Sequence, residues 1–85
     1  MSESVDHLLG RRLRWRRRAL GLTQHDLAQA CGVRFQQIAK YESGIHRLSA
    51  ATLWRLAQAL EADVAFFFES PNGPPAANGP GLDPT

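Results

Sequence analysis

The sequence predicts an all-α fold, and three observations support this prediction. Apolar residues recur three or four positions apart along several segments, which is the spacing of one face of a helix. Glycines at positions 10, 21, 32 and 44 punctuate the chain at intervals of 11, 11 and 12 residues, which suit short helices. No segment alternates between apolar and polar residues with a period of two, so nothing argues for a sheet. We therefore expect five helices.

The first helix is predicted to begin near Ser4 and to stop before Gly21. Four residues share the face that is expected to be buried, because they lie at i, i+4, i+8 and i+11: Leu9, Leu13, Arg17 and Leu20. The other faces carry arginines at positions 11, 12, 14, 16 and 18. Because a buried guanidinium needs a carboxylate, Arg17 is expected to have an acidic partner.

Capping residues delimit the next two helices. Thr23 suits the N-cap of a second helix, Gln24 to Ala30, in which Asp26 at the third position completes a capping-box-like pattern. Gly32 offers the left-handed residue that ends this helix. A third helix is predicted from about Phe35 to Glu42, ending at the next glycine.

Two further helices complete the predicted domain. Ser49 is expected to cap a fourth helix with an apolar stripe made of Leu53, Leu56, Ala57 and Leu60. Asp63 is expected to cap a short fifth helix that carries Val64, Phe67 and Phe68.

The sequence indicates one domain over residues 5–69 and a disordered Pro/Gly-rich tail over residues 70–85. All five prolines and three of the seven glycines lie after residue 70, so the tail cannot bury enough apolar surface to offset its chain entropy. A length of 85 residues suits one small domain and argues against a multidomain enzyme. No apolar run approaches the roughly 20 residues that span a bilayer, and no signal peptide is apparent. A cytoplasmic location is therefore expected.

The net charge of +2 hides a strong segregation of charge along the chain. All ten basic residues lie between Arg11 and Arg55, where the only acids are Asp26 and Glu42, so this segment carries 10 − 2 = +8. The six remaining acids lie in the flanks. A segment this basic indicates a polyanionic partner, either a nucleic acid or an anionic membrane surface.

Side chains for catalysis or metal binding are scarce. The chain has one cysteine, Cys31, and three scattered histidines, so we expect no internal disulfide, no metal and no cofactor. No Ser/His/Asp, Cys/His or paired-carboxylate arrangement is visible, so we do not expect an enzyme. Cys31 is expected to be a buried small apolar residue rather than a redox sensor.

The segment from Gln24 to Ser43 carries the most specific pattern. It places the small residue Ala28 where two helices would cross closely, a turn glycine at Gly32, and apolar residues around the crossing: Leu27, Cys31, Val33, Ile38 and Tyr41. The pattern resembles the helix-turn-helix of the Cro/C1-type (XRE) family of bacterial and phage repressors. The match runs from about Leu9 to Glu69 and implies a lambda-repressor-like DNA-binding domain.

The resemblance implies that the third helix enters the major groove of DNA and exposes its N-terminal residues to base edges. The expected base contacts are Arg34, Phe35, Gln36 and Lys40. The alternative for Gln36 is ordinary solvated helix surface, and the role of Gln37 is left open.

The resemblance also implies contacts to the DNA backbone and a structural ion pair. The expected backbone contacts are Gln24, Ser43 and Arg47. The family frequently pairs an arginine at the position of Arg17 with the glutamate that closes the third helix, so Arg17 and Glu42 are expected to pair. Arg11, Arg12, Arg14 and Arg18 are expected to form a solvated face.

The leading functional prediction is a sequence-specific transcriptional regulator, acting as a repressor that binds a palindromic operator as a homodimer through residues 34–42. The expected partner is double-stranded DNA and not a membrane, because the apolar stripe of the first helix is needed for the core. Candidates for the dimer interface are Trp54, Phe66 and Phe68; an edge of the core is the alternative place for Trp54. The alternative function is an antitoxin that binds a protein toxin and regulates its own operon.

Overall fold

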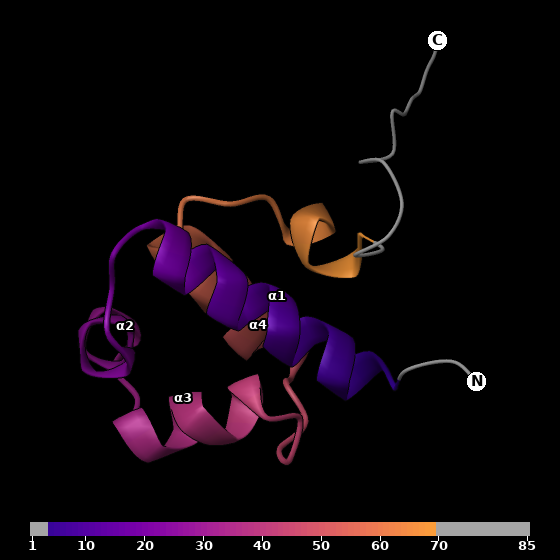
Figure 1. Cartoon of the computed structure of the whole chain (residues 1–85), viewed down its shortest axis with the longest axis horizontal. Helices are drawn as coiled ribbons and strands as arrows, with labels where there is room; N and C mark the ends of the chain where they lie inside the picture. Colours follow the sequence, from indigo (N-terminus) through magenta and orange to yellow (C-terminus); the bar gives the residue numbers. More distant parts are fainter. Residues whose placement is uncertain (1–3, 70–85) are drawn as a thin grey trace, which may run out of the picture.

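The computed structural model describes residues 4–69, which form four α-helices and a short 3₁₀ helix (Figure 1). The elements are α1 (Val5–Ala19), α2 (Gln24–Cys31), α3 (Phe35–Glu42), α4 (Ala50–Ala59) and η1 (Val64–Phe68). No strand occurs within these residues, which confirms the all-α class. The count of five helices was slightly wrong, because the last element is a single 3₁₀ segment of five residues. The predicted disordered tail lies outside the described residues.

Side-chain caps fix the starts of three helices. The side-chain oxygens of Ser4, Thr23 and Ser49 each accept a hydrogen bond from the backbone N–H three residues further on, at 3.0–3.2 Å. The carboxylate of Asp26 accepts a return bond from the Thr23 N–H at 2.9 Å, which completes the capping box. Asp63 occupies the predicted N-cap position of η1, but its side chain makes no capping hydrogen bond to that element.

All five elements contribute to one core. Each element supplies at least one of the largest fully buried side chains. These are Leu13 from α1, Leu27 from α2, Ile38 from α3, Leu56 from α4, Leu60 directly after α4, and Phe67 from η1. α1 packs against α3 on one side and against η1 on the other, as Figure 1 shows. α2 packs against α3 and α4. The buried sides of α2 and α3 are therefore held in place by packing against α1 and α4.

Leu20 departs from the predicted buried stripe of α1. It is 38% exposed, whereas Leu9, Leu13 and Arg17 are buried. The reason is that Leu20 is the C-cap residue and is followed by Gly21, which has a positive φ of 73°. Leu20 still has right-handed helical backbone angles, but the chain leaves the helical path directly after it, so its side chain lies at the end of the buried face and is only partly covered.

The sequence pattern predicted that Arg12 lies on a solvated face, and this prediction is wrong. Its Nε donates to the Phe66 carbonyl at 3.2 Å, and its Nη2 pairs with Glu69 at 3.0 Å. Its guanidinium lies 4.3 Å from the centre of the Phe66 ring. Arg16 similarly donates to the carbonyls of Leu60 and Glu61, at 3.0 and 3.2 Å. These two arginines fasten the C-terminal part of the domain to α1, and their partners lie more than forty residues away in sequence.

Gly10 lies where α1 crosses the end of α3. It is buried, and a Cβ atom added to it would lie 2.6 Å from the Glu42 carbonyl oxygen and closer still to that of Tyr41. Both obstacles are backbone atoms, which cannot rotate away. The absence of a side chain at Gly10 therefore sets how closely α1 approaches α3.

We predict that Gly10→Ala destabilises the fold, although alanine is normally about 1 kcal/mol better than glycine inside a helix. The added methyl group must push α1 and α3 apart, and overpacking of this kind costs roughly 1–3 kcal/mol. Urea unfolding followed by circular dichroism measures the change. A variant as stable as the parent protein, or more stable, would contradict the close contact.

Candidate nucleic-acid interface

α3 buries one side and exposes the other. Ile38, Tyr41 and Glu42 face the interior, whereas Gln36, Gln37 and Lys40 are exposed. The exposed residues line a shallow polar depression together with Arg34, which precedes the helix, and His46, which follows it. Phe35, the first residue of α3, is 37% exposed and lies outside the core. The four predicted base-contacting residues therefore lie together at the outer side and the start of one short helix.

Gln37 has a role that the sequence left open. Its side-chain oxygen accepts a hydrogen bond from the Arg34 backbone N–H at 3.4 Å. This bond satisfies one of the free donors at the start of α3, where Arg34 supplies no side-chain cap of its own. Gln37 therefore helps to define the first turn of the helix that carries Gln36.

The loop after α3 folds back onto the end of that helix. The Ser43 hydroxyl donates to the Lys40 carbonyl at 3.1 Å, and the Ile45 N–H donates to the same oxygen at 3.0 Å. The His46 ring meets the Tyr41 ring edge to face at 6.4 Å. The side chain of Arg47 is 87% exposed, and its Nε lies 3.9 Å from the carboxylate of Asp6. Arg47 is thus open to solvent beside the start of α1.

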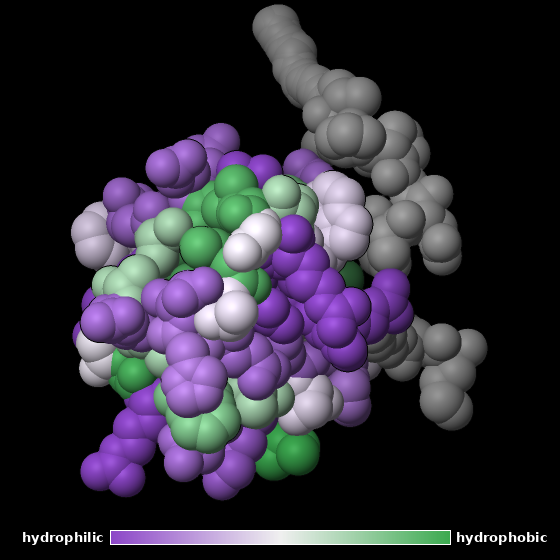
Figure 2. Space-filling model, turned by 60° about the vertical axis from the view of Figure 1, so that its left-hand side comes forward, coloured by the Kyte–Doolittle hydropathy of each residue, from purple (hydrophilic) through white to green (hydrophobic). Residues whose placement is uncertain are grey.

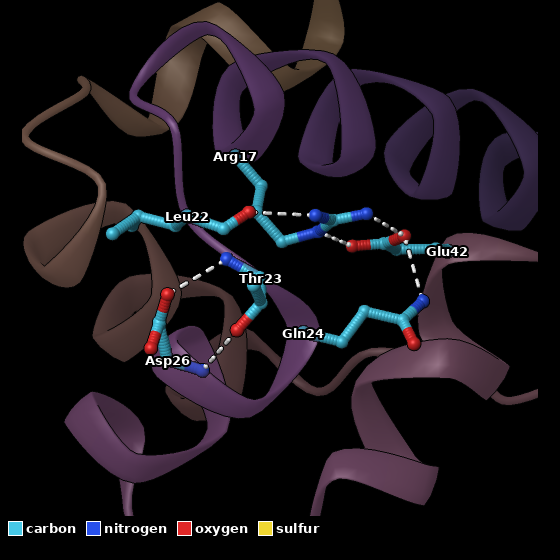
Figure 3. Close-up of polar contacts among 6 residues, drawn as sticks. All are labelled: Arg17, Leu22, Thr23, Gln24, Asp26 and Glu42. Atoms are coloured by element: carbon cyan, nitrogen blue, oxygen red, sulfur yellow. Dashed lines mark hydrogen bonds and ion pairs between the residues drawn. The ribbon is translucent and has the colours of Figure 1, made fainter.

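A buried polar network lies directly behind α3 (Figure 3). Arg17 and Glu42 form an ion pair with two hydrogen bonds, of 2.5 and 3.1 Å. Arg17 also donates to the Leu22 carbonyl at 2.7 Å, and the Gln24 amide donates to Glu42 at 3.1 Å. The hydrogen bonds to Glu42 raise the pKa of the Arg17 guanidinium above its usual value despite the opposing effect of burial. The Glu42 carboxylate thus joins Arg17 of α1 and the first residue of α2 to the last residue of α3, and Arg17 extends the network to the loop after α1.

This network uses part of the Gln24 side chain. Gln24 is the first residue of α2 and is half-buried, with its amide turned toward Glu42 in Figure 3. A primary amide has two N–H donors, and the bond to Glu42 uses one of them. The position of Gln24 at a helix N-terminus is therefore fixed from inside the protein.

The predicted burial of Cys31 is only partly correct. The residue is half-buried at the edge of the core, with its Sγ 4.0 Å from the Arg55 carbonyl. Partial burial raises the pKa of the Cys31 thiol, and the positive charge of Arg55 offsets this only in part. A raised pKa disfavours the reactive thiolate.

The aromatic residues at the end of the fold differ in exposure. Phe67 is fully buried, Phe66 is half-buried, and Phe68 is 52% exposed. The Phe66 ring stacks on Trp15 at a centroid distance of 5.7 Å, so it is largely engaged within the chain. Trp54 is 57% exposed. Trp54 and Phe68 therefore keep open apolar surface, and Phe66 offers less of it than the sequence suggested.

The face that carries α2 is largely hydrophilic, with apolar areas between the polar side chains (Figure 2).

Among the described side chains, no three His, Cys, Asp or Glu residues gather as a metal site would require. Between residues 4 and 69 no helix has both the length and the apolar character needed to cross a bilayer.

The geometry of α2 and α3 is that of a helix-turn-helix, with two short helices packed across a turn at Gly32. Residues 13–67 match the helix-turn-helix family, which covers more than half of the chain. The chain belongs to this family.

Two relatives show what the chain is similar to. An uncharacterized HTH-type transcriptional regulator of Sinorhizobium medicae is 42% identical over 78 residues, which cover 92% of this chain and 56% of that protein. An uncharacterized transcriptional regulator in the ATPase CF(0) region of Rhodospirillum rubrum is 50% identical over 64 residues, which cover 75% of this chain and 59% of that protein. The chain thus spans little more than half the length of these relatives.

Solved structures show the same fold. The clp gene regulator ClgR of Corynebacterium glutamicum is 30% identical with a TM-score of 0.76, and the match covers 79% of this chain and 87% of that chain. The restriction-modification controller protein C.AhdI of Aeromonas hydrophila is 32% identical with a TM-score of 0.72, and the match covers 74% and 96% of the two chains. These relatives give no support to the antitoxin alternative.

We predict that Arg17→Ala and Glu42→Ala each lower the free energy of unfolding by about 3–5 kcal/mol, because each leaves a buried charge without its partner. The double variant is expected to lose much less than the sum of the two. Chemical unfolding of the four proteins gives the coupling energy. Arg14→Ala and Arg18→Ala are the controls: both residues are exposed on the same helix, and each change should cost no more than about 0.5 kcal/mol. Strictly additive losses would mean that the pair does not couple.

Proposed function

We propose that this chain binds double-stranded DNA sequence-specifically through residues 34–42 and regulates transcription, as a repressor that occupies its operator. The observation that carries the proposal is the cluster of exposed side chains at the start and outer side of α3: Arg34, Phe35, Gln36 and Lys40. In a helix-turn-helix this helix enters the major groove and its N-terminal residues reach base edges. The names of the relatives as transcriptional regulators agree with this role.

Each proposed base contact has a chemical counterpart on DNA. The Gln36 amide fits the N6 and N7 atoms of adenine, and Arg34 or Lys40 fits O6 and N7 of guanine. Phe35 fits the methyl group of thymine. These are the side-chain types that distinguish one base pair from another in the major groove.

The proposed backbone contacts lie at the two ends of the α2–α3 unit. Gln24 stands at the N-terminus of α2, where free N–H groups and the positive end of the helix dipole favour a phosphate. Ser43 and Arg47 lie on or beside the loop that follows α3. Phosphate contacts at both ends would set the angle and depth of α3 in the groove.

Nucleic acid is favoured over an anionic membrane surface as the polyanionic partner. A membrane-binding α1 would have to present its apolar stripe to lipid, but Leu9 and Leu13 of that stripe are buried in the core. The exposed basic residues around α3 match the phosphate backbone without any such rearrangement.

The test of this function is selection of binding sites from random DNA, followed by titration of variants on the selected site. Gln36→Ala should lower the preference at one or two base pairs by about 1–3 kcal/mol while leaving the thermal midpoint unchanged. Arg47→Ala should instead weaken binding to all sequences alike and reduce the salt dependence. Gln29→Ala, an exposed residue of α2, serves as the matched control. Equal binding of the parent protein to random and selected DNA would contradict the proposal.

We further propose that the chain binds a palindromic operator as a homodimer. One recognition helix reads only a few base pairs, and a two-fold pair of chains doubles this number. Exposed apolar surface at Trp54 and Phe68 supports an interface through α4 and η1, with Phe66 at its margin. The arginine-rich outer face of α1 would repel its own copy.

The dimer predicts selected sites with two inverted halves about 34 Å, or 10 base pairs, apart. Sedimentation of the protein with one such site should give two chains per duplex. Phe68→Ser and Trp54→Ser should weaken this assembly, whereas Ile45→Ser, which changes an exposed apolar residue in the loop after α3, should not. A complex that contains a single chain at every protein concentration would end the dimer proposal.

A further inference from the structure

His25 and Phe35 form an aromatic stack at the start of the helix-turn-helix. His25 is the second residue of α2, and Phe35 is the first residue of α3. Their ring centres are 4.0 Å apart and their planes differ by 25°, so the rings lie nearly face to face. The contact therefore joins the N-terminal ends of the two helices.

This stack is not part of the hydrophobic core. His25 is exposed and Phe35 is 37% exposed, and neither belongs to the buried cluster or to the side chains packed against it. Within residues 4–69, the imidazole makes no hydrogen bond or salt bridge; it stacks on the Phe35 ring and interacts electrostatically with the adjacent carboxylate of Asp26. A ring pair at the surface adds little to the burial that stabilises the fold. Its position at the start of α2 and α3 indicates a role in the proposed DNA-binding surface rather than in stability.

We propose that His25 is a positioning residue for Phe35: it holds the Phe35 ring in the orientation in which that ring reads a base pair. This inference rests on the proposed DNA-binding function. Without a neighbour, an exposed phenylalanine at the first position of a helix exchanges among its rotamers, and fixing one of them on binding costs free energy. The stack with His25 fixes the Phe35 rotamer in the free protein, so less conformational entropy is lost on DNA binding.

The orientation of the ring matters because an apolar contact with a thymine methyl group has no hydrogen bond to direct it. Only the area of ring surface that meets the methyl group distinguishes thymine from cytosine at that place. A ring free to turn would contact either base pair with part of its surface. A ring held by His25 presents one fixed surface, which makes its contact selective.

The stack also links the two functions of the helix pair. α2 carries the proposed phosphate contact at Gln24, the residue next to His25, and α3 carries the base readers. Because His25 contacts Phe35, the placement of α2 on the DNA backbone also determines where the Phe35 ring lies in the groove. Phosphate contacts and base reading are thus connected by side chains as well as by the core.

The experiment measures discrimination at single base pairs of the selected site. Phe35→Ala first identifies the base pair that Phe35 reads. His25→Ala should then reduce discrimination at that same base pair by roughly two- to tenfold, the range expected from an aromatic pair, with an unchanged thermal midpoint. His25→Phe should restore discrimination because it restores the stack, whereas His25→Gln should not. In a Phe35→Ala background, His25→Ala should have no further effect on discrimination. Gln29→Ala on α2 is the matched control.

Three results would overturn the inference. One is full discrimination retained by His25→Ala. Another is equal weakening on all sequences, which would make His25 a phosphate contact. The third is a Phe35→Ala variant that changes no base preference while Gln36→Ala does. Each of these leaves the proposed function standing, because the parent protein still selects its site. Failure of the parent protein to select any site would instead remove the function itself.

Discussion

The arrangement of the helix-turn-helix depends on the buried ion pair between Arg17 and Glu42. A carboxylate at the end of α3 is costly to bury, and it becomes acceptable only because Arg17 and Gln24 both donate to it. The same guanidinium binds the Leu22 carbonyl in the loop between α1 and α2. A single polar group therefore ties three helices together at one point. Apolar packing alone would leave their relative rotation less well defined, since it has no direction.

The arginines of α1 serve different purposes on one helix. Arg17 faces the interior, Arg12 and Arg16 reach across to the last residues of the domain, and Arg14 and Arg18 are exposed. A count of positive charges along the sequence cannot separate these roles. The net positive charge that a DNA phosphate would meet is consequently smaller than the sequence total indicates.

Local features were predictable from sequence where the physical cause is local. The capping residues Ser4, Thr23 and Ser49 and the turn at Gly32 depend on neighbours three or four positions away, so the boundaries of α1 to α4 follow closely from the sequence. The partners of Arg12 were not predictable, because nothing nearby in the sequence points to Phe66 or Glu69. The His25–Phe35 stack was missed for a related reason. Two exposed aromatic residues ten positions apart give no periodic signal, and only the crossing of α2 and α3 brings them together.

The attachment of Glu69 to Arg12 also determines where the polypeptide leaves the domain. α1 separates η1 from α3, as Figure 1 shows, and Glu69 is held on the η1 side. Any segment joined after this residue starts on the far side of α1 from the helix that carries Gln36 and Lys40. The exposed side of α3 and the last described residue are thereby kept on opposite sides of α1. Such a layout would let segments of different length or chemistry follow Glu69 without covering the exposed side of α3.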